Sequence, residues 1–448
     1  MPRPGPLVDQ RVIVGADRRG LVLAGSQQAA LVLGPPRSGK TSGVVVPNVL
    51  SAPGPVLSTS TKPDVLAATL SRRSQRGRCW LYDPSGTVVV PPGVTPLRWS
   101  PVTGAATWDG ALLLARNLVG ARPTGGLSDA THWTERAEAL LAPILHAAAR
   151  SGVDASTVLG WINLRDGNPA LAELDPASTA GGLLRGLLST ESRELSGIWS
   201  TASGVLAAYR SDAALRSAES PNFDPAAFVA LGDTVYVCAS GQQQDLVGPL
   251  VVGLISDVRA AAFARSAARI GGGSDAVAPG VWAHEEPPLL LALDEVANIA
   301  PLPDLPGLVS EGGGQGVLTL ACLQDLSQAR KRWGGAADGF GSLFGATVVL
   351  PGIGDVRTLE AVSVQCGSHD VWVRSESRGS RQRSSTWSTR RQRRIEPDEV
   401  SRGRPGHALL IGGARRPTWT PITPYWEMAR SQPARPERRR AIGWVRGR

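Results

Sequence analysis

The sequence predicts an α/β fold in which a mostly parallel central sheet is interrupted by an inserted all-α domain. Short apolar runs typical of strands alternate with helical segments over residues 1–106. Strand signals then disappear and helical periodicity takes over in residues 107–221, after which the alternation resumes over residues 222–428. Alternating strands and helices are the pattern of a parallel sheet. At 448 residues the chain is long enough for a sheet domain that carries an insertion.

The first block contains strand-like runs with two helices between them. Pro47 would strain the first helix, because proline lacks the N–H group of an interior helical residue. The order strand, helix, strand is that of a βαβ unit. The expected strands are Arg11–Val14, Gly20–Ala24, Ala29–Leu33, Pro55–Ser58 and Cys79–Tyr82, and the expected helices are Ser42–Leu50 and Pro63–Arg76.

The second block is expected to be all helical. Its clearest signal is the spacing i, i+3, i+4, i+7 of apolar residues between Ala137 and Ala148. Further helices are expected at Asp109–Leu118, Ser156–Leu164, Gly181–Leu188 and Leu195–Tyr209. The strands expected to complete the sheet are Asp233–Ala239, Leu289–Leu293, Val317–Leu323, Ala346–Leu350 and Gly406–Gly412.

The formal net charge of +9 is concentrated in two arginine-rich segments. Residues 374–394 hold eight arginines and one glutamate (+7), and residues 430–448 hold seven arginines and one glutamate (+6), which leaves about −4 for the rest. Neither segment has apolar periodicity, so we expect a basic mobile loop at 374–394 and a basic disordered tail at 429–448. These segments could bind DNA phosphates, and Trp387 could stack on a base; a solvated charged surface is the alternative.

The composition argues against a secreted or membrane-spanning class. No stretch of about 18 uncharged apolar residues occurs, and the N-terminus lacks the apolar core of a signal peptide. We therefore expect a cytoplasmic protein. The four cysteines are isolated in apolar runs, so we expect them to be reduced and packed in the core: Cys79, Cys238, Cys322 and Cys366.

A phosphate-binding loop, GPPRSGKT, follows the strand-like run Ala29–Leu33. Its two glycines allow a tight turn that points backbone N–H groups at phosphates, at the positive end of the following helix. Lys40 is expected to reach the β- and γ-phosphates and to assist catalysis, and the Thr41 hydroxyl to bind Mg²⁺. The alternative is a glycine turn that caps a helix. The nucleotide-binding residues are expected to be Gly34, Pro35, Pro36, Arg37, Ser38, Gly39, Lys40, Thr41 and Ser42.

Two further strands end in polar residues suited to nucleotide hydrolysis. Leu289–Leu293 leads directly into Asp294 and Glu295. We expect Asp294 to contribute to the Mg²⁺ site through a bound water, and Glu295 to polarise the attacking water. Val317–Leu323 ends at Gln324, which is expected to sense the γ-phosphate. The alternatives are an acidic turn at a sheet edge and a helix-capping glutamine.

Phosphoryl transfer usually needs one more positive charge near the γ-phosphate, often from a neighbouring subunit. The candidates for this arginine finger are Arg330, Arg332 and Arg357. The alternative for each is a surface salt bridge.

Several stretches of the sequence match the pattern of one family. They are GPPRSGKTSGVVVPNVL at 34–50, STSTKPDVLAAT at 58–69 with YDPSG at 82–86, LALDEVANIAPLPDL at 291–305, ACLQDLSQARKRWG at 321–334 and IEPDEVSRGRPGHALLIGG at 395–413. Together they resemble the conjugative coupling proteins of type IV secretion systems, the TraG/TraD family with its TraM-recognition region.

The resemblance implies a RecA-like P-loop NTPase core, with the helical block as the all-α domain of the family. It implies an ATPase that uses ATP and Mg²⁺ and forms a homo-hexamer. The ring would pass relaxase-bound DNA, preferentially a single strand, or another secreted protein to membrane-anchored secretion components. It would lie in the cytoplasm, peripheral at the cytoplasmic face of the plasma membrane. By the same analogy Lys40, Thr41, Asp294, Glu295 and Gln324 keep the roles given above.

Two features depart from the family pattern. The family commonly begins with membrane-spanning helices, and we expect a soluble form in which a separate subunit supplies the anchor or the chain is peripheral. The second motif commonly carries an acid two residues before its lysine, where this chain has Ser60. We therefore assign no nucleotide-binding role to Lys62.

Two other functions are compatible with the same motifs. An FtsK-type translocase of double-stranded DNA shares the motor core, but it would not be expected to carry so large a helical insertion. A docking scaffold would bind ATP only to assemble a ring and recruit secreted proteins. The cargo is therefore single-stranded DNA, double-stranded DNA or protein, with the first favoured by the resemblance.

Overall fold

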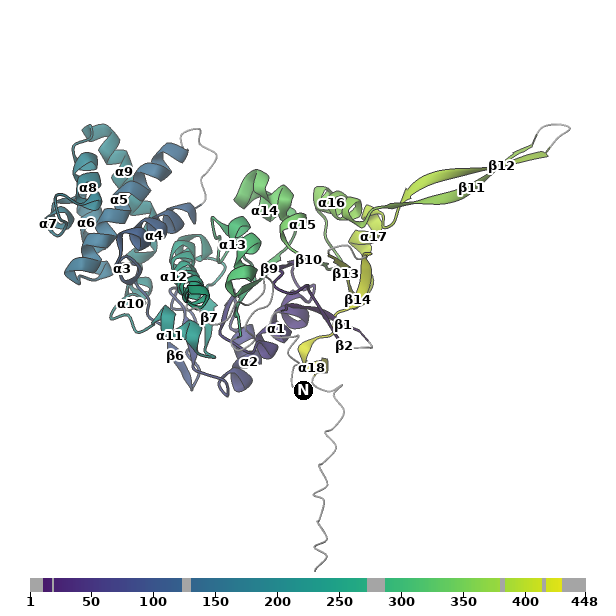
Figure 1. The fold of residues 1–448 in the computed structure, drawn as a ribbon, viewed down its shortest axis with the longest axis horizontal. Helices are drawn as coiled ribbons and strands as arrows, with labels where there is room; N and C mark the ends of the chain where they lie inside the picture. The colour runs from purple at the N-terminus through teal and green to yellow at the C-terminus, as the bar shows by residue number, and fades with distance from the viewer. Residues whose placement is uncertain are drawn as a thin grey trace, which may run out of the picture.

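The computed structural model describes residues 11–17, 20–122, 130–271, 287–378, 383–412 and 416–428. A ten-stranded sheet, in the order β14-β13-β10-β3-β9-β8-β4-β7-β5-β6, forms its centre (Figure 1). The eight strands from β10 to β6 are parallel to their neighbours, and β13 and β14 add an antiparallel edge. The expected α/β class with a mostly parallel sheet is confirmed.

The strands of this sheet lie close to the predicted runs, with β6 and β14 as additions. Their bounds are β3 (Ala30–Leu33), β4 (Val56–Ser60), β5 (Cys79–Tyr82), β6 (Val94–Pro96), β7 (Thr234–Cys238), β8 (Leu289–Leu293), β9 (Val317–Leu323), β10 (Ala346–Val349), β13 (His407–Ile411) and β14 (Thr418–Pro421). The first two predicted strands, β1 (Ile13–Asp17) and β2 (Gly20–Leu23), pair with each other in a separate antiparallel hairpin.

Helices fill the connections between the strands. On the nucleotide-loop side these are the π-helical turn η1 (Thr41–Val45), α1 (Val46–Ser51) and α2 (Asp64–Arg73). After β7 they are α12 (Gln244–Gly271), α13 (Leu305–Glu311), η3 (Gly312–Gln315), α14 (Leu326–Trp333), η4 (Gly334–Gly339), α15 (Phe340–Leu343), α16 (Val356–Cys366), α17 (Pro397–Arg402) and α18 (Tyr425–Met428).

The predicted strain at Pro47 is relieved by a change of helix type. The backbone N–H of Val46 donates to the carbonyl of Thr41, which is the wider spacing of a π-helical turn. A new α-helix starts at Val46, so Pro47 falls in its first turn. A proline there costs little because the first N–H groups of a helix have no intrahelical partner.

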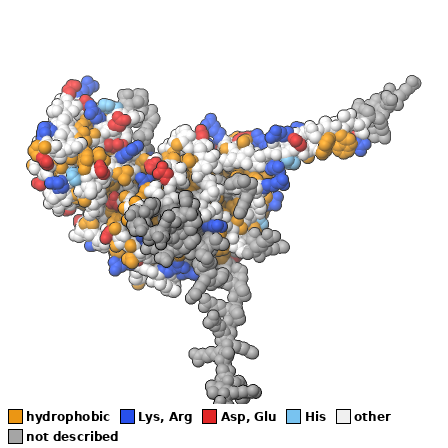
Figure 2. Space-filling view, viewed as in Figure 1, with side chains coloured by type: hydrophobic (Ala, Val, Ile, Leu, Met, Phe, Trp, Pro, Cys, Tyr) orange, Lys and Arg blue, Asp and Glu red, His pale blue; other side chains and the backbone are white. Residues whose placement is uncertain are grey.

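The segment 374–394, predicted to be a mobile loop, instead belongs to a β-hairpin. Strands β11 (Ser368–Arg378) and β12 (Arg383–Arg393) pair antiparallel from Ser368 opposite Arg393 to Arg378 opposite Arg383. The hairpin projects from the body of the molecule as an arm (Figures 1 and 2). The prediction was wrong because the apolar residues of the hairpin, Val371, Trp372, Val373 and Trp387, do not alternate with polar ones, so the pattern that identifies a half-buried strand is absent. The predicted tail, 429–448, lies outside the described residues.

The core lies on both faces of the sheet. Along β3 the side chains alternate: Ala30 and Val32 belong to one buried cluster, and Leu31 and Leu33 to the other. This is the period of two expected of a strand buried on both faces. The first cluster packs against α1, α2 and β1, and the second extends without interruption into the helical elements.

Between β6 and β7 all the described elements are helices, gathered at one end of the molecule (Figure 1). The 22-residue helix α5 contacts α4, α8 and α9 and contains the predicted apolar spacing. The elements are α3 (Pro101–Gly104), α4 (Trp108–Gly120), α5 (Ala130–Ser151), α6 (Ala155–Leu164), α7 (Asn168–Ala172), α8 (Thr179–Leu188), α9 (Ser192–Val205), η2 (Ala207–Arg210), α10 (Asp212–Arg216) and α11 (Pro225–Ala230).

The long helix α12 was not predicted individually. Within the described part of the chain it is the one helix long and apolar enough to cross a membrane by length and composition, over Gln244–Ala268 with mean hydropathy 1.6. However, 67% of its most apolar window is buried in the structure, and it packs against α4 and α11. In this fold α12 is therefore a core helix that joins the sheet to the helical block.

One partly buried carboxyl group marks this junction. Asp257 on α12 accepts a hydrogen bond of 2.8 Å from Trp99 Nε1, at the start of the helical block. Loss of water on burial raises the pKa of Asp257 to about 7, although the hydrogen bond from Trp99 opposes the shift. Between about pH 4 and pH 7 the folded state therefore holds a proton on Asp257 that the unfolded chain, with an aspartate pKa near 4, has already released.

This proton makes stability depend on pH. Because the folded pKa is raised, the contribution of Asp257 is present below about pH 4 and is lost as pH rises through about 7. Asp257→Asn keeps an acceptor for Trp99 but carries no charge, so we expect the variant to be more stable than the parent at pH 8 and nearly equal at pH 4. Urea unfolding midpoints of variant and parent at both pH values measure this. An equal difference between variant and parent at pH 4 and pH 8 would contradict the prediction.

Candidate functional site

The phosphate-binding loop joins β3 to η1 and is shaped by its two glycines. A Cβ atom on Gly34 would lie 2.6 Å from Ser38 Oγ and 2.9 Å from Leu350 Cβ, so a larger residue does not fit. Gly39 has a φ angle of 96°, a conformation that side-chain-bearing residues rarely adopt. The loop therefore has the strand, turn and helix setting that its motif requires.

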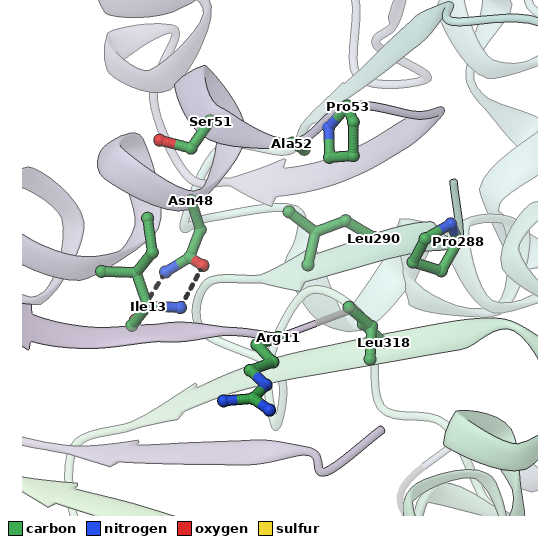
Figure 3. Close-up of a pocket in the computed structure, with 9 residues that line it drawn as sticks. All are labelled: Arg11, Ile13, Asn48, Ser51, Ala52, Pro53, Pro288, Leu290 and Leu318. Atoms are coloured by element: carbon green, nitrogen blue, oxygen red, sulfur yellow. Dashed lines mark hydrogen bonds between the residues drawn. The ribbon is translucent and has the colours of Figure 1, made fainter. Parts of the chain in front are cut away.

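The helix after this loop is fixed by Asn48. Its Oδ1 accepts from the backbone N–H of Ile13 and its Nδ2 donates to the Ile13 carbonyl, each at 2.8 Å (Figure 3). Nδ2 also donates to the carbonyl of Val44 at 2.8 Å. Asn48 is buried, and these bonds satisfy its amide group. The asparagine of the sequence motif thus attaches the β1 strand to α1 rather than contacting a ligand.

Lys40 is held within the loop. Its side chain is buried, and Nζ donates to the carbonyl of Gly34 at 2.6 Å and to that of Pro35 at 3.0 Å. These bonds keep the ammonium group against the backbone of the turn. An ammonium beside a row of backbone N–H groups is suited to bind the oxygens of a di- or triphosphate.

Thr41 and Asp294 meet although 253 positions separate them in the sequence. Thr41 Oγ1 donates to Asp294 Oδ2 at 2.6 Å, and Thr59 Oγ1 donates to the Asp294 carbonyl at 2.9 Å. Burial raises the pKa of Asp294 to about 6, while the bond from Thr41 opposes this shift. A hydroxyl and a carboxylate in contact beside a phosphate loop fit the oxygen-only preference of Mg²⁺. When bound there, Mg²⁺ would supply charge that polarises the phosphates.

Glu295 has an unusual backbone. Its φ angle is 53°, in the left-handed region that costs a non-glycine residue energy. Asn298 Nδ2 donates to Glu295 Oε2 at 3.1 Å and so orients the carboxylate. The side chain is half-buried next to Asp294, where it can act as a base towards a water molecule.

Gln324 lies at the end of β9, between the strands that carry the loop and the acids. The sheet order β3-β9-β8 places it there, and Gly34 N–H donates to the Leu323 carbonyl at 3.1 Å. The capping role weighed from the sequence falls to Asp325, whose side chain accepts from Ser327 N–H at the start of α14. Gln324 is therefore free of that role.

A cleft of about 360 Å³ opens over the loop, and part of its lining was not predicted. Tyr425 and Trp426 of α18 lie at this cleft with their rings edge-on at 5.0 Å, nearly 400 residues after the loop in sequence. An aromatic and apolar wall beside a phosphate loop is suited to a nucleotide base. The full lining is Arg37, Ser38, Gly39, Lys40, Thr41, Ser42, Val46, Asp64, Ala68, Tyr425 and Trp426.

Asp64 is a second residue that the sequence analysis did not assign to the cleft. Ser60 Oγ donates to Asp64 Oδ1 at 2.9 Å, so the serine found at the acidic position of the family motif positions a nearby acid. Lys62 is exposed and is absent from the lining of the cleft.

The three candidate arginines have different surroundings. Arg330 pairs with Asp355 at 2.5 Å, and Arg332 is largely buried and donates to the carbonyls of Gly120 at 2.8 Å and Pro301 at 3.1 Å. Burial lowers the pKa of Arg332 to about 10. Only Arg357, in the first turn of α16, is exposed among the three.

The comparisons with known proteins agree with the resemblance expected from the sequence. Residues 288–404 match the family model described as the TraM recognition site of TraD and TraG. This segment begins one residue before β8, so it contains both acids, Gln324 and the whole arm. No curated protein shows a significant match to the chain.

Solved structures of a conjugative coupling protein share the fold. The unbound form of the bacterial conjugative coupling protein TrwBdeltaN70 has a TM-score of 0.67 at 18% identity, over 92% of this chain and 89% of that one. TrwB with the GTP analogue GDPNP has a TM-score of 0.64 at 18% identity, over 89% and 86%. TrwB with ADP and Mg²⁺ has a TM-score of 0.61 at 18% identity, over 89% and 85%. The RecA-like fold is therefore confirmed.

The aromatic lining of the cleft can be tested separately from the phosphate loop. Trp426→Ala removes a ring that can stack on the base, and stacking on an aromatic side chain contributes about 1–3 kcal/mol. We expect the dissociation constant of ATP to rise about tenfold, measured by calorimetry. The control is Glu427→Gln, an exposed change on the same short helix outside the cleft. Equal affinities for the two variants would contradict the assignment.

Proposed function

We propose that this chain is an ATP-hydrolysing motor of the coupling-protein class, which moves DNA towards a type IV secretion channel. The observation that carries the proposal is the match of residues 288–404 to the TraM recognition family, because that segment supplies half of the nucleotide site. The loop residues Lys40 and Thr41 come from outside the segment and still meet Asp294 at hydrogen-bond distance. A chain with both halves in contact has the parts of a nucleotide hydrolase.

Each residue then has a role in hydrolysis. Lys40 and the N–H groups of the loop bind the phosphates, and Thr41 with Asp294 holds Mg²⁺ directly or through water. Glu295 orients and deprotonates the attacking water, with its carboxylate fixed by Asn298. Gln324, one strand away, reports the state of the γ-phosphate to the helix that follows it.

The remaining features of the proposal concern assembly. A homo-hexamer would place an exposed arginine of one subunit near the nucleotide of the next, and a ring can surround a DNA strand. Relaxase or another secreted protein would be delivered at the helical block, residues 107–221, and the ring would lie at the cytoplasmic face of the plasma membrane beside anchored secretion components. Structures of TrwB in complex with ADPNP and in complex with ADP and Mg²⁺ support ATP and Mg²⁺ as the cofactors of this chain.

A non-hydrolysing docking scaffold and an FtsK-type translocase remain the competing functions. A scaffold would not need Glu295 next to the Mg²⁺ pair. A translocase of the FtsK type would not be expected to carry the run of helices that lies between β6 and β7.

Glu295→Gln separates a motor from a scaffold. The change removes the base but keeps the size of the side chain, so we expect turnover to fall by about 10²–10⁴-fold while ATP affinity stays within about threefold. Steady-state ATPase assays with and without single- and double-stranded DNA measure this, with calorimetry for the affinity. Glu311→Gln, an exposed acid at the end of α13, is the matched control.

The outcomes distinguish the three functions. DNA-stimulated turnover that disappears in Glu295→Gln supports the motor. Absence of ATPase activity in the parent chain, with ATP binding retained, would instead support the scaffold. Stimulation by duplex DNA alone would favour the FtsK-type translocase.

We assign the arginine finger to Arg357. Arg330 is committed to Asp355, and Arg332 to two backbone carbonyls inside its own chain. A finger that acts on a neighbouring subunit must instead be exposed, and Arg357 is the exposed one of the three.

Arg357→Ala should lower ATP turnover about 10³-fold without weakening ATP binding or changing the thermal midpoint. Arg332→Ala, in contrast, should lower the thermal midpoint, because it leaves two partly buried carbonyls without their donor. Mixing Arg357→Ala with Glu295→Gln should restore part of the activity, since some interfaces then combine an intact arginine with an intact base. Failure of all mixtures to recover activity would argue against a finger acting between subunits.

A further inference from the structure

The arm, β11 with β12, has little contact with the rest of the described structure. Its base is attached where Arg393 pairs with Glu360 of α16 at 2.6 Å and Arg394 N–H donates to the Gly367 carbonyl at 2.9 Å. Beyond this base the strands extend away from the body (Figure 1). A two-stranded ribbon is only marginally stable by itself in water. An arm of this length is therefore expected to act on something outside its own chain.

The two faces of the arm differ. Residues directly opposite each other in an antiparallel pair share a face, and so do alternate residues of one strand. Trp372 is opposite Thr389, and Arg374 is opposite Trp387. Both tryptophans thus lie on one face, which we call the tryptophan face, as diagonal neighbours within reach of each other's aromatic side chains.

The tryptophan rings are exposed. Trp372 is 69% exposed and Trp387 is 59% exposed, values far above those of the tryptophans in the core. The guanidinium of Arg374 lies over the ring of Trp387 at 5.9 Å from its centroid. One face thus presents two aromatic rings and a guanidinium, all groups with flat surfaces on which a nucleobase can stack.

The charge of the arm favours a polyanion. Its sequence from 374 to 394 holds eight arginines and one glutamate. Two acids lie on the tryptophan face, and each is beside an arginine: Glu376 pairs with Arg374 at 3.2 Å, and Asp370 is opposite Arg391. The net field of the arm is therefore positive, which is the usual sign for a phosphate-binding surface.

The other side chains favour a nucleic acid over a second copy of this chain. The arm is rich in serine and threonine, and its described apolar residues are few: Val371, Trp372, Val373 and Trp387. The cores of protein–protein interfaces are depleted in serine and are formed by larger apolar groups. Hydroxyl and guanidinium groups, in contrast, are frequent donors to phosphate and sugar oxygens.

We propose that the tryptophan face of the arm binds single-stranded DNA. Two bases stack on Trp372 and Trp387, and Arg374 and the neighbouring arginines neutralise the phosphates between them. The bases must be unpaired, because a duplex does not expose their faces. This inference rests on the proposed function, and it adds a DNA contact at a place distant from the nucleotide cleft.

The test is the binding of a fluorescein-labelled 20-nucleotide oligo(dT) to the full chain, followed by anisotropy. The variant carries Trp372→Ala and Trp387→Ala together, and the matched control carries His369→Ala and Val373→Ser on the opposite face of the same strand. We expect the double tryptophan variant to bind at least about tenfold more weakly and the control to bind within about twofold of the parent. Since all four side chains are exposed, ATP affinity and basal ATPase activity should be unchanged in both.

A second variant keeps the test valid if stacking alone contributes little. Arg374→Ala should weaken binding of the oligonucleotide. It should also reduce the slope of log affinity against log salt concentration, by the amount that corresponds to about one phosphate contact. Competition with unlabelled duplex of the same length should be weaker than competition with the single strand.

Other results would overturn the inference. If DNA stimulates the ATPase of the parent but the tryptophan variant binds the single strand as the parent does, the arm is not the DNA contact although the motor function stands. If native mass spectrometry instead detects an oligomer of the parent that the variant does not form, and the variant keeps the DNA affinity of the parent, the face is an interface between copies of this chain. If the parent binds no DNA, the inference and the motor function both fail.

Discussion

The register of three parallel strands decides whether this chain has a nucleotide site at all. β9 lies between β3 and β8, with Leu33 level with Leu323, and Leu293 level with Ala321. Because the carboxyl ends of parallel strands emerge at one edge, Thr41, Asp294 and Gln324 arrive together from segments about 30 to 280 residues apart. A slip of one residue in β8 would turn Asp294 to the other face of the sheet. The bond of 2.6 Å between Thr41 and Asp294 therefore depends on hydrogen bonds along the whole centre of the sheet.

The sequence identified local groups well and their spatial neighbours poorly. The glycine loop and the strand that ends in Asp294 and Glu295 are visible because each is a contiguous pattern with its own chemistry. Tyr425 and Trp426 were missed, since nothing in their local sequence indicates that β14 returns the chain to the cleft. Strand order is a property of long-range packing, which no single run of residues encodes.

Two elements were missed for opposite reasons of composition. The few apolar residues of the arm do not alternate with polar ones, so it lacks the pattern that identifies a strand, and its backbone pairing shows that it is a hairpin. Helix α12 is apolar around much of its circumference, so it lacks a distinct polar face over its first turns. Neither element has one buried apolar face and one exposed polar face, which is the arrangement that sequence patterns detect.

The contacts beyond Gln324 connect the nucleotide site to the helical block. The helix that follows Gln324 is α14, and its last residues reach in two directions. Arg332 donates to the carbonyl of Gly120 at the end of α4 and to that of Pro301, while Trp333 Nε1 donates to the Leu302 carbonyl at 2.8 Å.

The loop that contains Pro301 and Leu302 begins just after Glu295, so α14 contacts both this loop and the helical block. Because Arg332 donates to both carbonyls, a displacement of α14 either carries both partners with it or leaves these polar groups unpaired. A movement that starts at Gln324 must therefore be shared by the loop after Glu295 and by α4. In the proposed motor, Arg332 therefore connects the segment after Gln324 to the helical block.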